Sequence, residues 1–164
     1  MTDNTVSQTL KEDRIRQRLA EKFSFLQDKI VIQRPRRIFA EVEKQNLEAV
    51  LEFAMRELDF TILCAITGLD NGATLGLIYH MARADGVTLN IRTAVPKDNP
   101  VINTVTRYFS CAEIYEREVM DLLGVKIDGL GEGERYPLPD SWPKDVYPLR
   151  KDWKPDVKNE VKNA

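Results

Sequence analysis

The chain has 164 residues, a length that suits one compact domain with an attached arm rather than two full domains. Hydrophobic residues make up 43% of it and charged residues 30%, which is typical of a globular protein and argues against disorder throughout. A formal net charge of −2 gives no overall field that would attract nucleic acid or an anionic membrane. Because no apolar run approaches the roughly 20 residues that span a bilayer, we expect neither membrane insertion nor export.

The first part of the chain predicts a helix, a hairpin and a second helix. Apolar residues spaced four apart predict a helix over residues 13–23. Two short strands, 29–33 and 38–42, flank a proline-containing turn and predict a hairpin. Residues 46–58 have the clearest amphipathic helical pattern in the chain.

A second group of strands follows. The continuous apolar run over residues 60–67 predicts a strand in the middle of the sheet. Strands over residues 75–81 and 87–95 flank Asp85-Gly86, a dipeptide that suits a tight hairpin.

Helical patterns then cover residues 101–109 and 112–123, and Gly124 ends the second of these helices. This order of elements predicts an α+β fold in which helices pack on one face of a mixed sheet. We assign residues 1–135 to this domain and residues 136–164 to an extended C-terminal arm.

The arm differs in composition from the rest of the chain. Five prolines and both tryptophans lie between Tyr136 and Pro155. Prolines favour an extended backbone, and exposed aromatic rings are costly unless they cover a surface. The arm is therefore expected to lie either on its own domain or on another subunit, and the composition leaves both alternatives open.

Two residue types bear on cofactors. Cys64 and Cys111 stand too far apart in the sequence to form a metal-binding pair, so we expect both to be buried and reduced and the chain to hold no metal cluster of its own. His80 is the only histidine, and we expect it to be structural rather than catalytic.

Charged residues crowd the predicted helix over residues 112–123. Arg117 lies four residues from both Glu113 and Asp121, which predicts a solvated stripe of ion pairs. Glu118 has the same spacing from two apolar residues, which would place it at the edge of the buried face, where it needs a cationic partner.

Three segments in this part of the chain carry a family resemblance. They read Tyr-Glu-Arg-Glu-x-x-Asp-Leu-Leu-Gly (115–124), Leu-Pro-x-Ser-Trp-Pro (138–143) and Tyr-Pro-Leu-Arg-Lys-Asp-Trp (147–153). They resemble the signature of the thirty-kilodalton subunit family of respiratory NADH:quinone oxidoreductase (complex I), which includes the equivalent subunits of membrane-bound energy-converting nickel–iron hydrogenases. Val146-Tyr147, where respiratory members commonly read Gly-His, makes the chain more similar to the hydrogenase branch.

The resemblance implies a non-catalytic subunit of the hydrophilic arm of such a complex, peripheral on the cytoplasmic side of the cell membrane. Its implied partners are the large subunit and the small iron–sulfur subunit. The resemblance also implies that this chain binds no cofactor. Nickel–iron and iron–sulfur centres would reside in the partners, or flavin, iron–sulfur and quinone in the complex I alternative.

We expect the subunit interface to combine the charged helix with the arm. Arg150 offers a guanidinium for bidentate pairing with a carboxylate, and apolar residues flank it. We therefore predict one charged network at the subunit boundary, built by the 116–118 and 150–152 segments. The full predicted interface comprises Glu116, Arg117, Glu118, Asp121, Trp142, Tyr147, Pro148, Leu149, Arg150, Lys151, Asp152 and Trp153.

Two other functions are weaker alternatives. A stand-alone enzyme would use Glu116, Glu118 or Asp121 as acid and base, but the sequence supplies no paired nucleophile, metal-ligand cluster or nucleotide fingerprint. A nucleic-acid-binding module would use the basic turn at residues 34–37, a single short basic segment.

Overall fold

The computed structural model describes residues 3–155, with side chains described from residue 11 onward. Residues 156–164 of the predicted arm lie outside the described residues. In chain order the elements are α1 (Asp3–Lys22), η1 (Ser24–Leu26), β1 (Ile30–Arg34), β2 (Arg37–Glu41), η2 (Lys44–Asn46), α2 (Leu47–Glu57), β3 (Ile62–Asp70), β4 (Thr74–Ala82), β5 (Thr88–Pro96), β6 (Val101–Asn103), α3 (Ala112–Leu123) and β7 (Lys126–Asp128).

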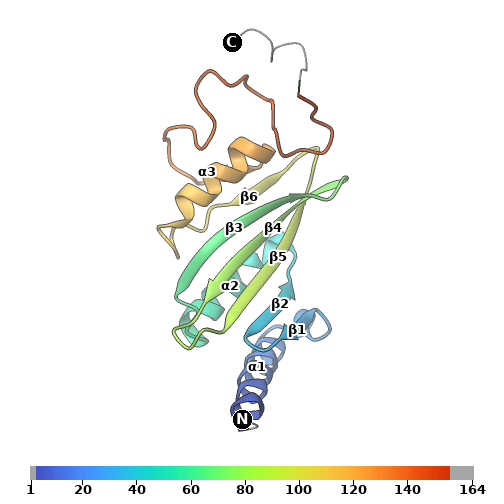
Figure 1. The fold of residues 1–164 in the computed structure, drawn as a ribbon, viewed down its shortest axis with the longest axis vertical. Coiled ribbons are helices and arrows are strands. Elements are labelled where there is room, and N and C mark those ends of the chain that lie inside the picture. The colour runs from blue at the N-terminus through green and yellow to red at the C-terminus, as the bar shows by residue number, and fades with distance from the viewer. Residues whose placement is uncertain (1–2, 156–164) are drawn as a thin grey trace.

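Five strands form one mixed sheet in the order β1-β2-β5-β4-β3, which confirms the predicted α+β class (Figure 1). The two predicted hairpins are present as the antiparallel pairs β1/β2 and β4/β5. Between them, β2 pairs with β5 in parallel, so the sheet joins two strands that are about fifty residues apart in the chain.

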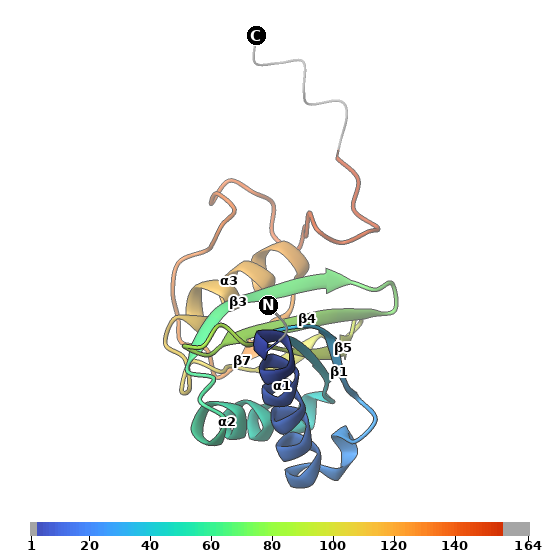
Figure 2. The same cartoon turned by 60° about the horizontal axis from the view of Figure 1, so that its bottom comes forward.

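The hydrophobic core lies on one face of this sheet. Tyr79 and Met81 of β4 stand opposite Ile91 and Leu89 of β5 in the ladder, and all four side chains are buried. Figure 2 shows α1 and α2 beneath the sheet. The buried face of α2 is made of Leu47, Val50, Leu51 and Ala54.

The predicted position of the third strand is wrong, because β3 lies at an edge of the sheet and not in its middle. Its apolar character has another cause. Helix α3 packs beside β3, and a β-carbon at Gly68 would come within 2.3 Å of the Leu123 side chain. One side of the strand therefore faces the core under α3, and this explains why the strand is so apolar.

The predicted helix over residues 101–109 is also wrong. Residues 101–103 form β6, which pairs in parallel with β7, and the remainder forms turns. Val101 and Ile102 are β-branched and favour a strand, and the partner strand lies more than twenty residues later. Local periodicity cannot reveal such a pairing.

Two further expectations need correction. The first helix begins at Asp3, ten residues before its predicted start. Cys64 and Cys111 are both exposed rather than buried. Within the described residues, we find no helix with the length and hydropathy required to cross a membrane.

Candidate functional site

The buried face of α3 holds a carboxylate. Glu116 is 1% exposed and lies among Ala112, Val119 and Leu123. It accepts hydrogen bonds from the Thr104 hydroxyl at 2.6 Å and from the Val105 backbone N–H at 2.7 Å. Burial raises the pKa of Glu116, and the two hydrogen bonds oppose that shift only in part. Glu116 thus fixes α3 to the segment that follows β6.

Glu118 is half-buried, which agrees with its predicted place at the edge of the buried face, but the fully buried carboxylate of α3 is Glu116, which the spacing did not single out. Glu118 shares a stripe of the helix with Ile114 and Leu122, and this stripe is only partly covered: Ile114 is 46% exposed, while Glu118 and Leu122 are half-buried. The fully buried stripe of Ala112, Glu116, Val119 and Leu123 lies beside it, on the face that α3 turns toward β3 and β7.

On the outer side of α3, the predicted solvated ion pairs are replaced in part by contacts with the following loop. Arg117 pairs with Glu113 at 2.8 Å as expected, and it also donates to the Gly131 carbonyl at 3.0 Å. Asp121 accepts hydrogen bonds from the Arg135 guanidinium and, at 2.8 Å, from the Leu138 backbone N–H. The helix therefore anchors the start of the arm.

The C-terminal end of α3 anchors a later part of the arm. The Leu149 N–H donates to the Leu122 carbonyl at 3.1 Å, and the Arg150 guanidinium donates to the Leu123 carbonyl at 2.7 Å. Arg150 also lies over the Tyr147 ring, 4.5 Å from its centroid. The last carbonyls of a helix lack partners within the helix and carry partial negative charge, so a cation is stabilising there.

The predicted pairing of Arg150 with a carboxylate of α3 is thus not what the structure has. Its partner is a backbone carbonyl, and none of the ion pairs of the described residues joins the 116–118 segment to the 150–152 segment. The arm is instead held at the C-terminal end of α3 by hydrogen bonds to the Leu122 and Leu123 carbonyls.

A second anchor was missed by the sequence analysis. The Asp70 carboxylate, at the end of β3, accepts hydrogen bonds from the Gly72 N–H at 2.7 Å, the Lys97 ammonium at 2.7 Å and the Lys151 N–H at 2.8 Å. The Lys97 ammonium also pairs with Asp152 at 3.0 Å. The sequence marks Asp70-Asn-Gly only as a turn, and nothing local indicates that the arm returns to it.

The charged groups of this second anchor, Asp70, Lys97 and Asp152, stabilise one another's charged forms. The hydrogen bond from Lys97, followed by the backbone N–H groups, holds the pKa of Asp70 well below its ordinary range. The pKa of Lys97 is raised by its bonds to Asp70 and Asp152, and Lys97 in turn lowers the pKa of Asp152. All three groups therefore stay charged over the physiological range.

The tryptophans of the arm pack against each other. Their ring centroids, in Trp142 and Trp153, are 6.0 Å apart, and the Trp142 indole donates to the Val146 carbonyl at 2.8 Å. The described part of the arm thus folds back on its own domain, which was one of the two open alternatives. It leaves Leu149 55% exposed and Tyr136 42% exposed, so the other alternative is compatible with its outer side.

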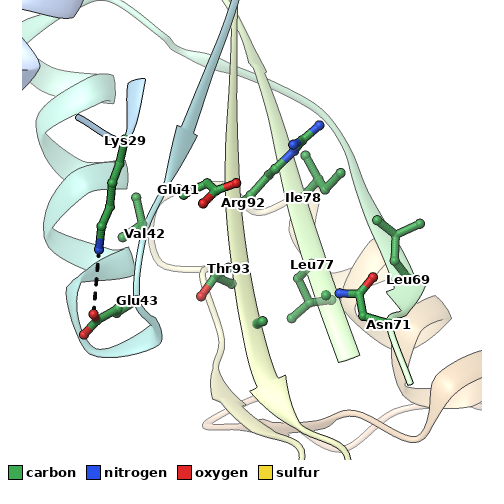
Figure 3. Close-up of a pocket in the computed structure, with 12 residues that line it drawn as sticks. Lys29, Glu41, Val42, Glu43, Leu69, Asn71, Leu77, Ile78, Arg92 and Thr93 are labelled. Carbon is green, nitrogen blue, oxygen red and sulfur yellow. Dashed lines mark ion pairs between the residues drawn. The ribbon is translucent and has the colours of Figure 1, made fainter. Parts of the chain in front are cut away.

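A pocket of about 590 Å³ is lined by residues of β3, β4 and β5 and by Lys29 and the 41–43 segment (Figure 3). Its lining mixes charge signs, and Lys29 pairs with Glu43 at 3.8 Å across one end. Neither histidine nor cysteine lines it. His80 lies elsewhere on the sheet, where its ring nitrogens contact Thr67 at 2.9 Å and Asn90 at 2.6 Å, as a structural role requires.

Among the described residues, no group of three or more histidine, cysteine or acidic side chains is placed to hold a metal ion. The candidate site is instead the surface formed by α3 and the arm, which several hydrogen bonds hold together. It presents exposed apolar side chains, among them Leu149 and Ile114, and exposed apolar side chains that lie together are typical of a protein contact.

Comparison with known proteins points to one family. The model of the family described as "Respiratory-chain NADH dehydrogenase, 30 Kd subunit" matches residues 40–159. This range includes all three of the quoted segments and most of the sheet.

Individual relatives agree with that match. The chain is 33% identical over 134 residues to membrane-bound hydrogenase subunit beta of Pyrococcus furiosus, covering 78% of this chain and 76% of that protein. It is 34% identical over 125 residues to a subunit of the F(420)H(2) dehydrogenase of Methanosarcina mazei, covering 74% and 78%. A chain in the solved structure of the membrane-bound sulfane sulfur reductase, an archaeal respiratory membrane complex, has a TM-score of 0.79 and 28% identity, covering 88% of this chain and 86% of that chain.

Proposed function

The chain belongs to the family of the 30 kDa subunit of respiratory-chain NADH dehydrogenase, and from this premise we propose that it is a non-catalytic subunit in the hydrophilic arm of a membrane-bound oxidoreductase complex. The observation that carries the proposal is the extent of the match, since the relative from a membrane-bound hydrogenase aligns over about three quarters of both chains. The family signature falls on α3 and the arm, the part of the surface with exposed apolar side chains.

We propose further that the complex is an energy-converting nickel–iron hydrogenase. The hydrogenase relative and the Val146-Tyr147 sequence support this assignment. The corresponding subunit of complex I is the alternative, and the description of the family supports it. The two assignments predict the same kind of contact but different partners.

The proposed partners are the large subunit and the small iron–sulfur subunit. In this proposal, the nickel–iron and iron–sulfur centres belong to those partners, and the present chain orients them without carrying electrons. Its contribution is a rigid surface in which the arm is held on α3 by the Asp70 and Arg150 contacts.

Affinity purification from gently solubilised membranes tests the proposal. The full-length chain, tagged and expressed in its own host, should bring down a hydrogenase large subunit and an iron–sulfur subunit, identified by mass spectrometry, with nickel in the purified complex. The chain purified alone should contain neither nickel nor iron by metal analysis.

The alternatives give different results in the same experiment. A flavin-containing, quinone-linked assembly would assign the chain to complex I. A chain that elutes by itself from its own host, or that holds a redox cofactor when purified alone, would overturn the proposal.

A further inference from the structure

One carboxylate of α3 stands apart from its neighbours. Every other charged side chain of the helix is used within the described part of the chain: Glu113 pairs with Arg117, Glu116 is hydrogen-bonded to Thr104 and Val105, and Asp121 binds Arg135. Over residues 11–155, the Glu118 side chain takes part in no hydrogen bond or ion pair. The residue as a whole is half-buried.

The surroundings of Glu118 are apolar. Ile114 precedes it by one helical turn and Leu122 follows it by one, so the three share a stripe of α3. Leu149 of the arm lies beside Leu122, to which its N–H is bonded, and it is 55% exposed. We call this surface, made of Ile114, Glu118, Leu122 and Leu149, the α3 stripe.

The α3 stripe borders a groove. Glu118, Leu122 and Leu149 line a hollow of about 240 Å³ together with Tyr115 and the edge strand β3. Residues 62–69 of that strand include neither a charged residue nor a proline, the features that commonly protect an edge from pairing. The groove therefore offers an apolar side and an unprotected strand edge to an extended segment.

We propose that the α3 stripe is the contact surface for an extended segment of a partner subunit that carries a lysine or arginine between apolar residues. This inference rests on the proposed function and names the chemistry of the partner. The cation supplies the charge that Glu118 lacks within its own chain, and the flanking apolar side chains cover Ile114 and Leu149. A carboxylate surrounded by apolar groups at an interface favours such a partner strongly, because without one it would be desolvated and unpaired.

Charge reversal at Glu118 tests the inference in the assembled complex. The full-length E118K variant should recover the partner subunit at a level lower than wild type by roughly tenfold or more, since two cations would then face each other. E118Q, which keeps the shape and removes the charge, should have a smaller effect. D28K is the matched control, because Asp28 is an exposed carboxylate in the turn before β1, distant in sequence from the α3 stripe, and it should assemble like wild type.

A photo-crosslinker identifies what lies on the surface. Benzoylphenylalanine in place of Ile114 should crosslink to a peptide of the large or small subunit that contains a lysine or arginine flanked by apolar residues, and the same probe at Asp28 should not. The thermal stability of isolated E118K should equal that of wild type. If the thermal stability of E118K is lower than that of wild type, its loss of assembly could reflect unfolding, and the crosslink from Ile114 then tests the inference by itself.

The outcomes separate this inference from the proposed function. Wild-type chain that recovers no partner overturns the proposed function. Wild-type chain that assembles while E118K assembles equally well overturns the inference alone. A crosslink from Ile114 to a second copy of this chain or to lipid would overturn it as well.

Discussion

At the scale of single residues, Glu116 is the side chain whose chemistry is most strongly set by the fold. Its carboxylate is desolvated, so its pKa lies above the ordinary value of 4.5. A group whose folded-state pKa is raised makes its largest contribution to stability below the unfolded-state pKa. That contribution is lost as the pH rises from 4.5 through the folded-state pKa.

Substitution of Glu116 should separate its charge from its hydrogen bonds. E116A leaves the buried Val105 N–H without a partner and should lower the free energy of unfolding by about 1–3 kcal/mol. E116Q can still accept from the Val105 N–H with its amide oxygen, and its amide nitrogen can donate to the Thr104 hydroxyl, so it should cost less than E116A and should flatten the decline of stability above pH 4.5. Urea unfolding of both variants and wild type between about pH 4 and 8 measures this, and parallel curves for E116Q and wild type would contradict it.

Gly124 gives a second prediction at this scale. Its φ is +71°, and a β-carbon there would lie 2.5 Å from the Tyr147 ring. G124A should therefore cost about 1–2 kcal/mol for the backbone and also push the arm off the helix end. Gly72 is the matched control, because its φ is +92° but nothing lies within 4 Å of an added β-carbon.

The two glycine variants should differ in arm docking rather than in backbone cost alone. Both tryptophans belong to the arm, so intrinsic fluorescence reports on its environment. The emission of G124A should shift to the red relative to wild type, and that of G72A should not. Equal emission from all three proteins would show that Tyr147 moves aside without releasing the arm.

At the scale of elements, Asp70 connects the β3–β4 turn with the arm. In D70N the amide oxygen can accept from Lys97 and Lys151, which share one carboxylate oxygen in the wild type, but the NH2 group then faces the Gly72 N–H and the charge opposite the Lys97 ammonium is lost. We expect proteolysis of the arm to accelerate by roughly tenfold, since charge-assisted bonds are lost and cleavage follows the released population. D85N is the control, because Asp85 caps a similar turn in the β4–β5 hairpin.

The pH dependence of arm docking follows from the same group. The pKa of Asp70 is depressed below its ordinary value of 3.8, so its stabilisation is present above 3.8 and is lost only as the pH falls through the lower folded-state value. Tryptophan emission of the wild type should therefore stay constant as the pH falls to 3.8. A red shift that begins between about pH 5 and 4 would contradict this.

At the scale of the whole molecule, two neighbouring residues of the arm have different roles: one binds the chain's own domain and the other is exposed on the outer surface. Arg150 faces inward to the Leu123 carbonyl, while Leu149 is exposed. R150E should therefore release the arm in the isolated chain and also abolish assembly. L149D should abolish assembly and leave tryptophan emission unchanged. Recovery of the partner subunit and emission spectra of both variants check this prediction, and an undocked arm in L149D would contradict it.

Much of the fold could be predicted from local patterns. Hairpins and amphipathic helices depend on residues close together in the chain, so β1/β2, β4/β5, α2 and α3 were found with nearly correct bounds. The β6/β7 pair and the edge position of β3 depend on contacts that form across long separations, and periodicity carries no information about them. The interface role of the predicted residues stays a prediction, as does the domain boundary after residue 135.

The candidate site was predicted only in part for a related reason. The motif identified α3 and the arm as the important segments, but charge spacing could not show which face of α3 is buried. It also could not show that Asp70 and Lys97, far from the motif, would hold the arm. These contacts are set by where the chain returns in space.

The parallel pairing of β2 with β5 has a consequence for synthesis on the ribosome. The first hairpin emerges early, but the strand beside which it lies is completed only at Pro96. Until β5 has been synthesised, the edge of β2 is unpaired and the apolar side chains that β5 will cover stay exposed. The sheet of the nascent chain therefore stays incomplete for roughly fifty residues of elongation. During this interval the unpaired edge of β2 and the exposed apolar residues beneath it are available for a chaperone to bind.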